Sequence, residues 1–148
     1  MKLIYKMLAF SLVIMTSYSS QAQILTSNRQ AYFNKYADKL PTAESELNKA
    51  FTTPEGGKVK INFADFTFNG IVTSSVKRYD NLYSVVVKSP GLNNTIFAIS
   101  KIINPDKTVS YVGRIINEKY ADGYQLKREN TGRYSMNKIR TDALIEDY

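Results

Sequence analysis

The chain has 148 residues, of which 43% are hydrophobic and 22% are charged, a balance typical of one folded globular domain. Its 20 Lys and Arg against 13 Asp and Glu give a net charge of +7, which favours acidic partners or surfaces without identifying one. It has no His and no Cys, which excludes Ser-His-Asp and Cys-His catalysis and the usual ligand sets for zinc, haem and iron–sulfur clusters. We therefore expect no cofactor and no metal.

The first 22 residues have the pattern of a secretory signal peptide. Two lysines precede an apolar run over 7–15, and the sequence SQA at 20–22 fits the small-x-small rule of signal peptidase. The run is shorter than the roughly 20 residues that span a membrane, so we expect no transmembrane segment after cleavage. We expect cleavage near Ala22-Gln23, and a secreted or periplasmic single domain over 23–148 with a net charge of +5. An exported chain without disulfides favours a bacterial source.

The segment 24–51 is predicted to be helical, in two parts. In 27–40, Ser27 and Gln30 form an S-x-x-Q capping box, and apolar residues follow at helical spacing. In 42–51 the apolar residues again form one stripe, with acidic residues near the N-terminal end and a lysine near the C-terminal end, as the helix dipole favours. Residues 52–57 are expected to form a loop.

The segment 58–140 is predicted to be an antiparallel sheet, because its apolar and polar residues alternate. A change of phase at Ala64-Asp65 predicts a bulge or bend within one long strand. Turn signals recur at 79–81, 89–94, 104–107, 121–123 and 129–132. The predicted fold is α+β, mainly β: an antiparallel β-meander, as a strongly twisted sheet or half-barrel, with one or two N-terminal helices packed on it. The tail, 141–148, is predicted to form one helical turn.

Two S-x-x-K patterns, Ser74–Lys77 and Ser135–Lys138, have the spacing of the serine–lysine pair of acylating enzymes. That chemistry needs a helix, where residues three apart share a face. Both copies fall in predicted strands, where residues three apart face opposite sides of the sheet. We therefore expect neither pair to be catalytic.

Carboxylates offer the remaining enzymatic alternative. Four acids could pair for acid–base chemistry, namely Asp65, Glu118, Asp122 and Glu129. Four side chains could supply calcium ligands, namely Asp80, Asn81, Asp106 and Asp122. All fall in predicted turns or at strand ends, where Asp and Asn commonly form turns and acids are solvated. We expect no catalytic and no metal-binding residues, and a carboxylate-dependent hydrolase is the less favoured alternative.

Tyrosines and basic residues gather in the predicted sheet. Tyrosine beside arginine is typical of binding surfaces, and aromatic rings beside cations also suit acidic sugars. The structural alternative is that tyrosine has a high strand propensity and packs well when half-buried. The candidate binding residues are Tyr83, Tyr111, Arg114, Tyr120, Tyr124 and Arg133.

A series of short motifs between Phe68 and Ile139 carries a resemblance to a known family. FNGIV, IFAISKI, VSYVGRII, YADGYQL and GRYSMNKI follow one another in that order. This order resembles the β-rich N-terminal pro-region of secreted metalloproteases from Bacteroidota-type bacteria. The resemblance implies a module that covers a protease domain or helps it to fold. No H-E-x-x-H helix follows before Tyr148, so it implies action on a partner in trans, as an inhibitor or folding helper.

The resemblance also gives a reading of the segment 110–126. It would form a hairpin at the centre of the sheet, in which Gly113 allows a neighbouring aromatic ring to pack closely. Arg114 and Tyr124 would then face the partner.

The sequence therefore predicts an exported, small, non-enzymatic binding module. Its partner is expected to be a protein, with an acidic envelope polysaccharide or a small apolar ligand as alternatives. No nucleic acid is expected, because no nucleic-acid-binding motif is present.

Overall fold

The computed structural model describes residues 29–64 and 66–141. Within these residues the chain forms eight strands, one α-helix and two short 3-10 helices. The elements, in chain order, are η1 (Phe33–Lys35), β1 (Lys39–Thr42), α2 (Glu44–Thr52), β2 (Lys58–Phe63), β3 (Phe66–Tyr79), β4 (Leu82–Ser89), η2 (Pro90–Leu92), β5 (Thr95–Ile103), β6 (Val109–Ile116), β7 (Asp122–Arg128) and β8 (Tyr134–Arg140).

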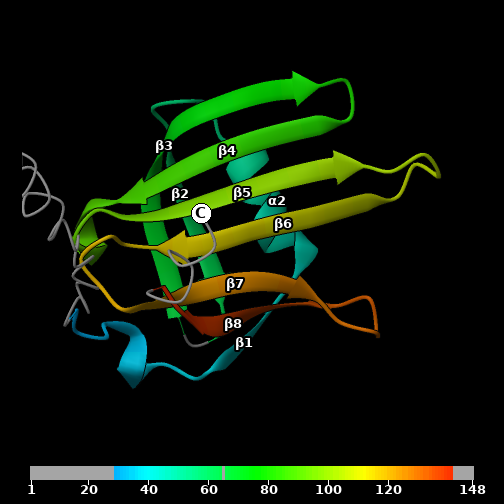
Figure 1. The fold of residues 1–148 in the computed structure, drawn as a ribbon. Helices are drawn as coiled ribbons and strands as arrows, with labels where there is room; N and C mark the ends of the chain where they lie inside the picture. The colour runs from blue at the N-terminus through cyan, green and yellow to red at the C-terminus, as the bar shows by residue number, and fades with distance from the viewer. Residues whose placement is uncertain (1–28, 65, 142–148) are drawn as a thin grey trace, which may run out of the picture.

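All eight strands belong to one antiparallel sheet with the order β1-β8-β7-β6-β5-β4-β3-β2 (Figure 1). Strands β2 to β8 form a meander in which each strand pairs with the next in sequence, and β1 pairs with the far side of β8. The structure therefore confirms the predicted antiparallel β-meander with a helix. In the part of the chain that it describes, no helix has the length and apolarity needed to cross a membrane.

The sheet curls into a half-barrel because β3 is long and bent. Its first half pairs with β2 and its second half pairs with β4, and the register shifts between Val72 and Ser74. At Gly70 a Cβ atom would lie only 2.6 Å from Val87 Cγ1, so glycine lets β4 approach at the bend. In Figure 1, β2 and the start of β3 consequently pass behind the other strands.

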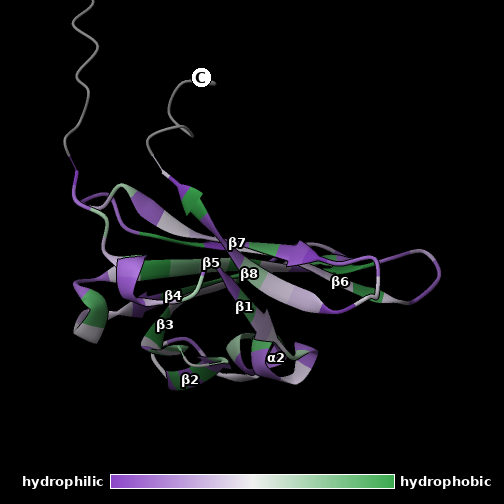
Figure 2. Ribbon diagram, turned by 90° about the horizontal axis from the view of Figure 1, so that it is seen from below, coloured by the Kyte–Doolittle hydropathy of each residue, from purple (hydrophilic) through white to green (hydrophobic). Residues whose placement is uncertain are grey.

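The curl brings the two edges of the sheet together at one corner. The Thr42 hydroxyl of β1 donates a hydrogen bond to the backbone carbonyl of Asn62 in β2, at 3.5 Å. The helix α2 connects these two edge strands and lies beside β2 (Figure 2). The side chains of Leu47 and Ala50 on α2 are fully buried, so the helix closes the open side of the half-barrel.

Aromatic rings fill the inside of the half-barrel. Phe66 contacts the rings of Phe33, Phe63, Phe68 and Tyr124, with centroids 5.9–6.5 Å apart. All of these side chains are at most 1% exposed. The alternating pattern of the strands therefore marked the inner face correctly, and burial of these rings is the main stabilising contribution to the fold.

The structure contradicts the first predicted helix. Of the segment 27–40, residues 33–35 form one 3-10 turn and Lys39 begins β1, while Ser27 lies outside the described residues. The backbone carbonyls of this segment bond to the sheet instead of to a helix. The Tyr124 hydroxyl donates to Ala37 at 2.8 Å, and the Lys138 backbone N–H donates to Asp38 at 2.7 Å. The second predicted helix, 42–51, is confirmed as α2.

Two predicted turns also lie elsewhere. The phase change at Ala64 is the tight connection between β2 and β3, with φ of 49° at Ala64, rather than a bulge in one strand. The turn expected at 121–123 falls earlier, where the Tyr120 N–H bonds to the Asn117 carbonyl, and β7 already begins at Asp122. The predicted turns at 79–81, 89–94, 104–107 and 129–132 separate strands as expected. Of the predicted helical tail, 142–148 lies outside the described residues.

Candidate functional site

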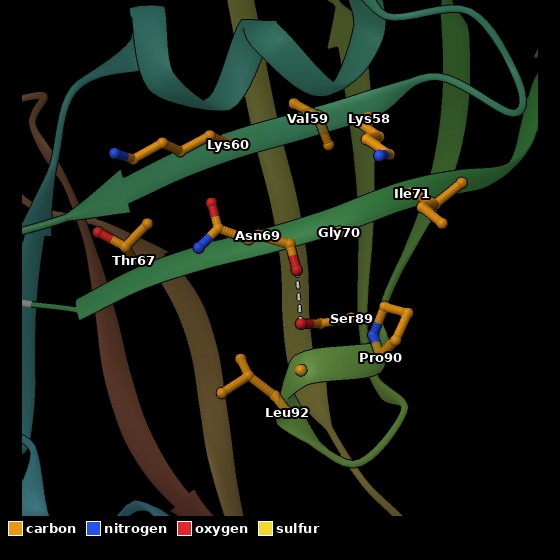
Figure 3. A pocket seen from close by; sticks show the side chains of 11 residues that line it. Lys58, Val59, Lys60, Thr67, Asn69, Gly70, Ile71, Ser89, Pro90 and Leu92 are labelled. Carbon is orange, nitrogen blue, oxygen red and sulfur yellow. Dashed lines mark hydrogen bonds between the residues drawn. The ribbon is translucent and has the colours of Figure 1, made fainter.

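The candidate site is a groove of about 500 Å³ between the β2–β3 hairpin and the short helix η2. Figure 3 shows η2, with Pro90 and Leu92, facing the hairpin across this space. The lining residues are Lys58, Val59, Lys60, Thr67, Asn69, Gly70, Ile71, Ser89, Pro90, Gly91 and Leu92. Two of them are lysines and none is acidic, so the groove combines an apolar wall with a positive rim.

Hydrogen bonds hold the η2 wall of the groove in place. The Ser89 hydroxyl donates to the Asn69 carbonyl of β3 at 2.5 Å, as the dashed line in Figure 3 marks. The Thr95 hydroxyl donates to the Leu92 carbonyl at 2.5 Å. The Asn117 side-chain amide donates to the Asn93 carbonyl at 2.9 Å. Because both ends of η2 are bonded to the sheet, the groove is preformed.

The positive rim comes from the outward-facing side of β2, and Lys88 of β4 lies near it. Lys58 and Lys60 alternate with the buried Val59 and Ile61, so both lysines point away from the core. Ile71 lies directly between Lys58 and Lys88 in the register of three neighbouring strands. Among the described residues, none of the three lysines forms an ion pair with a carboxylate. Their charges are therefore available to a ligand.

The free edge of β2 is covered by α2. The Glu46 carboxylate accepts hydrogen bonds from the Asn62 backbone N–H at 2.8 Å and from Lys49 Nζ at 2.6 Å. The bond from Lys49, followed by the bond from Asn62, holds the pKa of Glu46 below its ordinary value. This carboxylate satisfies an edge N–H that could otherwise pair with another chain, so it protects the strand that carries Lys58 and Lys60.

The structure separates the six residues that the sequence analysis predicted for binding. Tyr124 is fully buried and Tyr111 is 7% exposed, so both rings belong to the core. The expectation that Tyr124 faces a partner is corrected by this placement: its ring packs on Phe33 and Phe66, and its hydroxyl bonds to Ala37.

The other four predicted residues lie at the surface but do not converge. Arg114 is exposed on the outer face of β6, and Arg133 is exposed beside the β7–β8 turn. Tyr120 is partly buried, stacks on Tyr32 with centroids 4.5 Å apart, and bonds to the Asn93 side chain. Tyr83 is partly buried and stands between two lysines of the neighbouring strands. None of the six lines the groove.

Gly113 has a different role from the one expected. A Cβ atom at this position would lie 2.7 Å from the Ala98 carbonyl oxygen and 3.2 Å from Ile99 Cα. The close neighbour is therefore the backbone of β5 and not an aromatic ring.

The candidate catalytic and metal-binding acids are used separately in the fold. The buried Asp122 accepts hydrogen bonds from the Tyr32 and Phe33 backbone N–H groups, at 2.7 and 2.9 Å. Glu129 pairs with Lys39 and accepts from Ser135, and the bond from Lys39, followed by that from Ser135, lowers its pKa. Asp65 lies outside the described residues.

The turn acids that were weighed as calcium ligands, and not expected to bind a metal, have local partners. Asp106 accepts from the Thr108 hydroxyl and backbone N–H, and these two bonds lower its pKa. Asp80 pairs with Lys77 at 2.9 Å. No group of three or more acids arranged to hold a metal ion occurs in residues 29–64 and 66–141. Both S-x-x-K patterns lie in strands, β3 and β8, as predicted.

Sequence reasoning missed the groove because its two walls are far apart in the chain. The alternation of Lys58 and Lys60 with apolar residues indicated that both lysines face outward. The segment 89–94 was predicted only to be a turn, and nothing in its sequence placed it opposite these lysines. No protein-family model, curated protein or solved structure matches this chain.

Proposed function

We propose that this protein is an exported, non-enzymatic binding module that holds an acidic, partly apolar segment of another protein in the groove between the β2–β3 hairpin and η2. The observation that carries this proposal is the combination of Lys58 and Lys60, which have no carboxylate partner among the described residues, with the apolar side chains of Ile71 and Leu92 around one preformed space. An apolar centre with a polar rim is the usual anatomy of a protein-binding surface.

The shape of the molecule supports a site on the outside. The inside of the half-barrel is occupied by the core aromatic rings, whereas the groove opens on the outer side of the hairpin. The resemblance to protease pro-regions suggests a secreted protease as the class of partner. The +5 charge expected after signal removal would assist encounter with an acidic surface.

A designed peptide tests the groove directly. We expect a fluorescent peptide of alternating Glu and Leu to bind, and a Lys-Leu peptide of equal length not to bind, in fluorescence polarisation. An exposed lysine–carboxylate pair contributes about 0.2–1 kcal/mol, so the double variant K58M/K60M should weaken binding by about 2- to 30-fold.

Two controls separate this proposal from non-specific attraction. Lys127 is exposed on β7 and has no carboxylate partner among the described residues, so K127M should change the affinity less than about twofold. A Glu-Ser peptide should bind more weakly than the Glu-Leu peptide, because it cannot fill the apolar wall. Equal loss in K127M and K58M/K60M, or equal binding of both acidic peptides, would overturn the proposal.

Export is part of the same proposal and has its own test. The protein should be expressed in a Gram-negative host with residues 1–22 included. We expect a periplasmic or secreted product whose intact mass matches a chain that begins at Gln23. Recovery of only the uncleaved chain from such a host would contradict cleavage near Ala22-Gln23, and would leave the peptide experiment unaffected.

A further inference from the structure

Lysine and tyrosine alternate in a straight row across four neighbouring strands. Lys77 of β3 lies opposite Tyr83 of β4, Tyr83 lies opposite Lys101 of β5, and Lys101 lies opposite Tyr111 of β6. Directly opposite residues point to the same face of a sheet. Since Tyr111 is buried on the inner face, the whole row projects from that face.

The row lies where the core ends. Phe51, in the last turn of α2, packs on Tyr111 with centroids 5.9 Å apart and so covers the buried end of the row. The other end of the row, on β3, is open. There Lys77 is exposed, and Tyr83 and Lys101 are partly buried.

The rings position the ammonium groups without neutralising them. Lys101 Nζ lies 5.1 Å from the centroid of Phe51 and 5.5 Å from that of Tyr83. Lys77 Nζ lies 6.0 Å from the centroid of Tyr83. These are cation–π contacts, which attract the cation and leave its N–H donors free to bond elsewhere.

Three donor groups in the row are open to a ligand. In the described part of the chain, Lys101 has no carboxylate partner and the Tyr83 hydroxyl has no hydrogen-bond partner. Lys77 pairs with Asp80, whose side chain is fully exposed, and an exposed pair of this kind contributes little. An anion bound at the row would accept hydrogen bonds from these donors and balance the two positive charges.

We propose that Lys77, Tyr83 and Lys101, the Lys–Tyr row, bind a linear acidic polysaccharide. Neighbouring strands lie about 4.8 Å apart, so the backbones that carry Lys77 and Lys101 stand roughly 10 Å from each other. The Tyr83 side chain projects between these two lysines in the register of the strands. A row of cations along successive strands is matched by a ligand that carries anionic groups at intervals along an extended chain. A polymer of uronic acids does so, with hydroxyl groups between the carboxylates that can bond to Tyr83.

The chemistry of the row favours sugar over a protein segment. The energy of protein interfaces concentrates in apolar pockets filled by aromatic or aliphatic anchors. The groove beside η2 offers such a wall, whereas the open part of the row offers two ammonium groups and a hydroxyl. Hydrophilic sugar rings match these donors without requiring an apolar pocket. The row is thus a second site, independent of the proposed protein-binding groove.

Calorimetric titration with a galacturonic acid tetramer at low salt tests this site. The tetramer should bind, and the galacturonic acid monomer should bind at least about tenfold more weakly, since it cannot reach both lysines. Losing one charge-assisted hydrogen bond costs about 1.5 kcal/mol or more, so K101M should weaken tetramer binding by about tenfold. K77M/K101M should remove measurable binding, and K101R should retain it.

Methionine keeps most of the length and the apolar character of the lysine stem, so these variants should fold. K127M and K58M/K60M are the matched controls, and both should bind the tetramer within about twofold of the unchanged protein. If K101M fails to fold, amide NMR of the unchanged protein decides instead, with tetramer-induced shifts expected at Tyr83 and Lys101.

Four results would overturn the assignment. The first is that the tetramer does not bind at low salt, and the second is that a folded K77M/K101M variant binds it unchanged. The third is that the tetramer-induced NMR shifts map to the groove. The fourth is that an octaglutamate peptide binds to the row as tightly as the tetramer or more tightly. The last result would assign the row to a protein partner. Because the Glu-Leu peptide experiment uses different residues, either proposal can fail alone.

Discussion

A single buried carboxylate attaches the N-terminal segment to the sheet. Asp122 is 5% exposed, and its two oxygens accept separate backbone N–H groups, from Tyr32 and Phe33. These bonds fix the turn that directs the Phe33 ring into the core, where it contacts Phe66 and Tyr124. Asp122 is therefore a structural hydrogen-bond acceptor. From the sequence alone it could be assigned only to a turn, a metal site or an acid pair.

We expect D122A to destabilise the protein by about 1–3 kcal/mol, because two partly or fully buried N–H groups lose their acceptor. D122N should be intermediate, since it keeps one carbonyl oxygen. Urea unfolding measures the difference. The control is D80A, which removes an exposed acid paired with an exposed lysine and should change stability by less than about 0.5 kcal/mol. A D122A variant as stable as D80A would contradict this role.

At the scale of elements, the segment 27–40 shows how tertiary bonds override helical spacing. Its side chains Phe33 and Leu40 are buried, as they would also be on the inner face of a helix, whereas Ala37 is exposed. Without β1, the strand β8 would have no partner on its outer side. Pairing of Lys39–Thr42 with β8 gives the backbone groups on that side of β8 hydrogen-bond partners. Pro41 is tolerated because β1 is an edge strand, where a missing N–H costs least.

The β5–β6 pair depends on the absence of a side chain at Gly113. We expect G113A to cost about 1–3 kcal/mol in urea unfolding, because the added methyl group would press on the backbone of β5 at Ala98 and Ile99. G91A is the control, since a Cβ atom there meets nothing within 4 Å. If G113A proved as stable as G91A, the two strands would not be in the close contact described.

At the scale of the whole molecule, two acids connect the N-terminal elements to the rest of the sheet. Glu46 connects α2 to β2, and Glu129 connects the β7–β8 turn to Lys39 of β1. Hydrogen bonds lower the pKa of both carboxyls from an ordinary value of 4.5. The half-barrel is therefore held partly by groups that lose their charge in acid.

A lowered pKa in the folded state means that the contribution to stability is complete above the unfolded pKa and is lost as the pH falls through the folded value. We expect the urea midpoint to fall between pH 6 and pH 3. The variant E46Q/E129Q should have a lower midpoint at pH 6 and a smaller fall towards pH 3. Urea unfolding followed by circular dichroism at several pH values gives the slope of the midpoint against pH for each protein. Equal slopes for the unchanged protein and the variant would contradict this account.

The sequence by itself determined the local features of this protein. Alternation of apolar residues over 58–140 marked the inner face, since side chains of a strand alternate between faces whatever the strand pairs with. Turn residues located most strand connections, and the stripe and end charges of 42–51 identified α2. The absence of His and Cys excluded whole classes of chemistry without any structure.

Only the tertiary structure decided which distant residues meet. The pairing of β1 with β8 and the burial of Tyr111 and Tyr124 depend on how the strands are ordered and packed in the curled sheet. The groove joins residues 58–71 to 89–92, and the Lys–Tyr row joins Lys77 to Lys101. A pattern read along one strand carries no register with the next, so neither site could be read from the chain before the strands were paired.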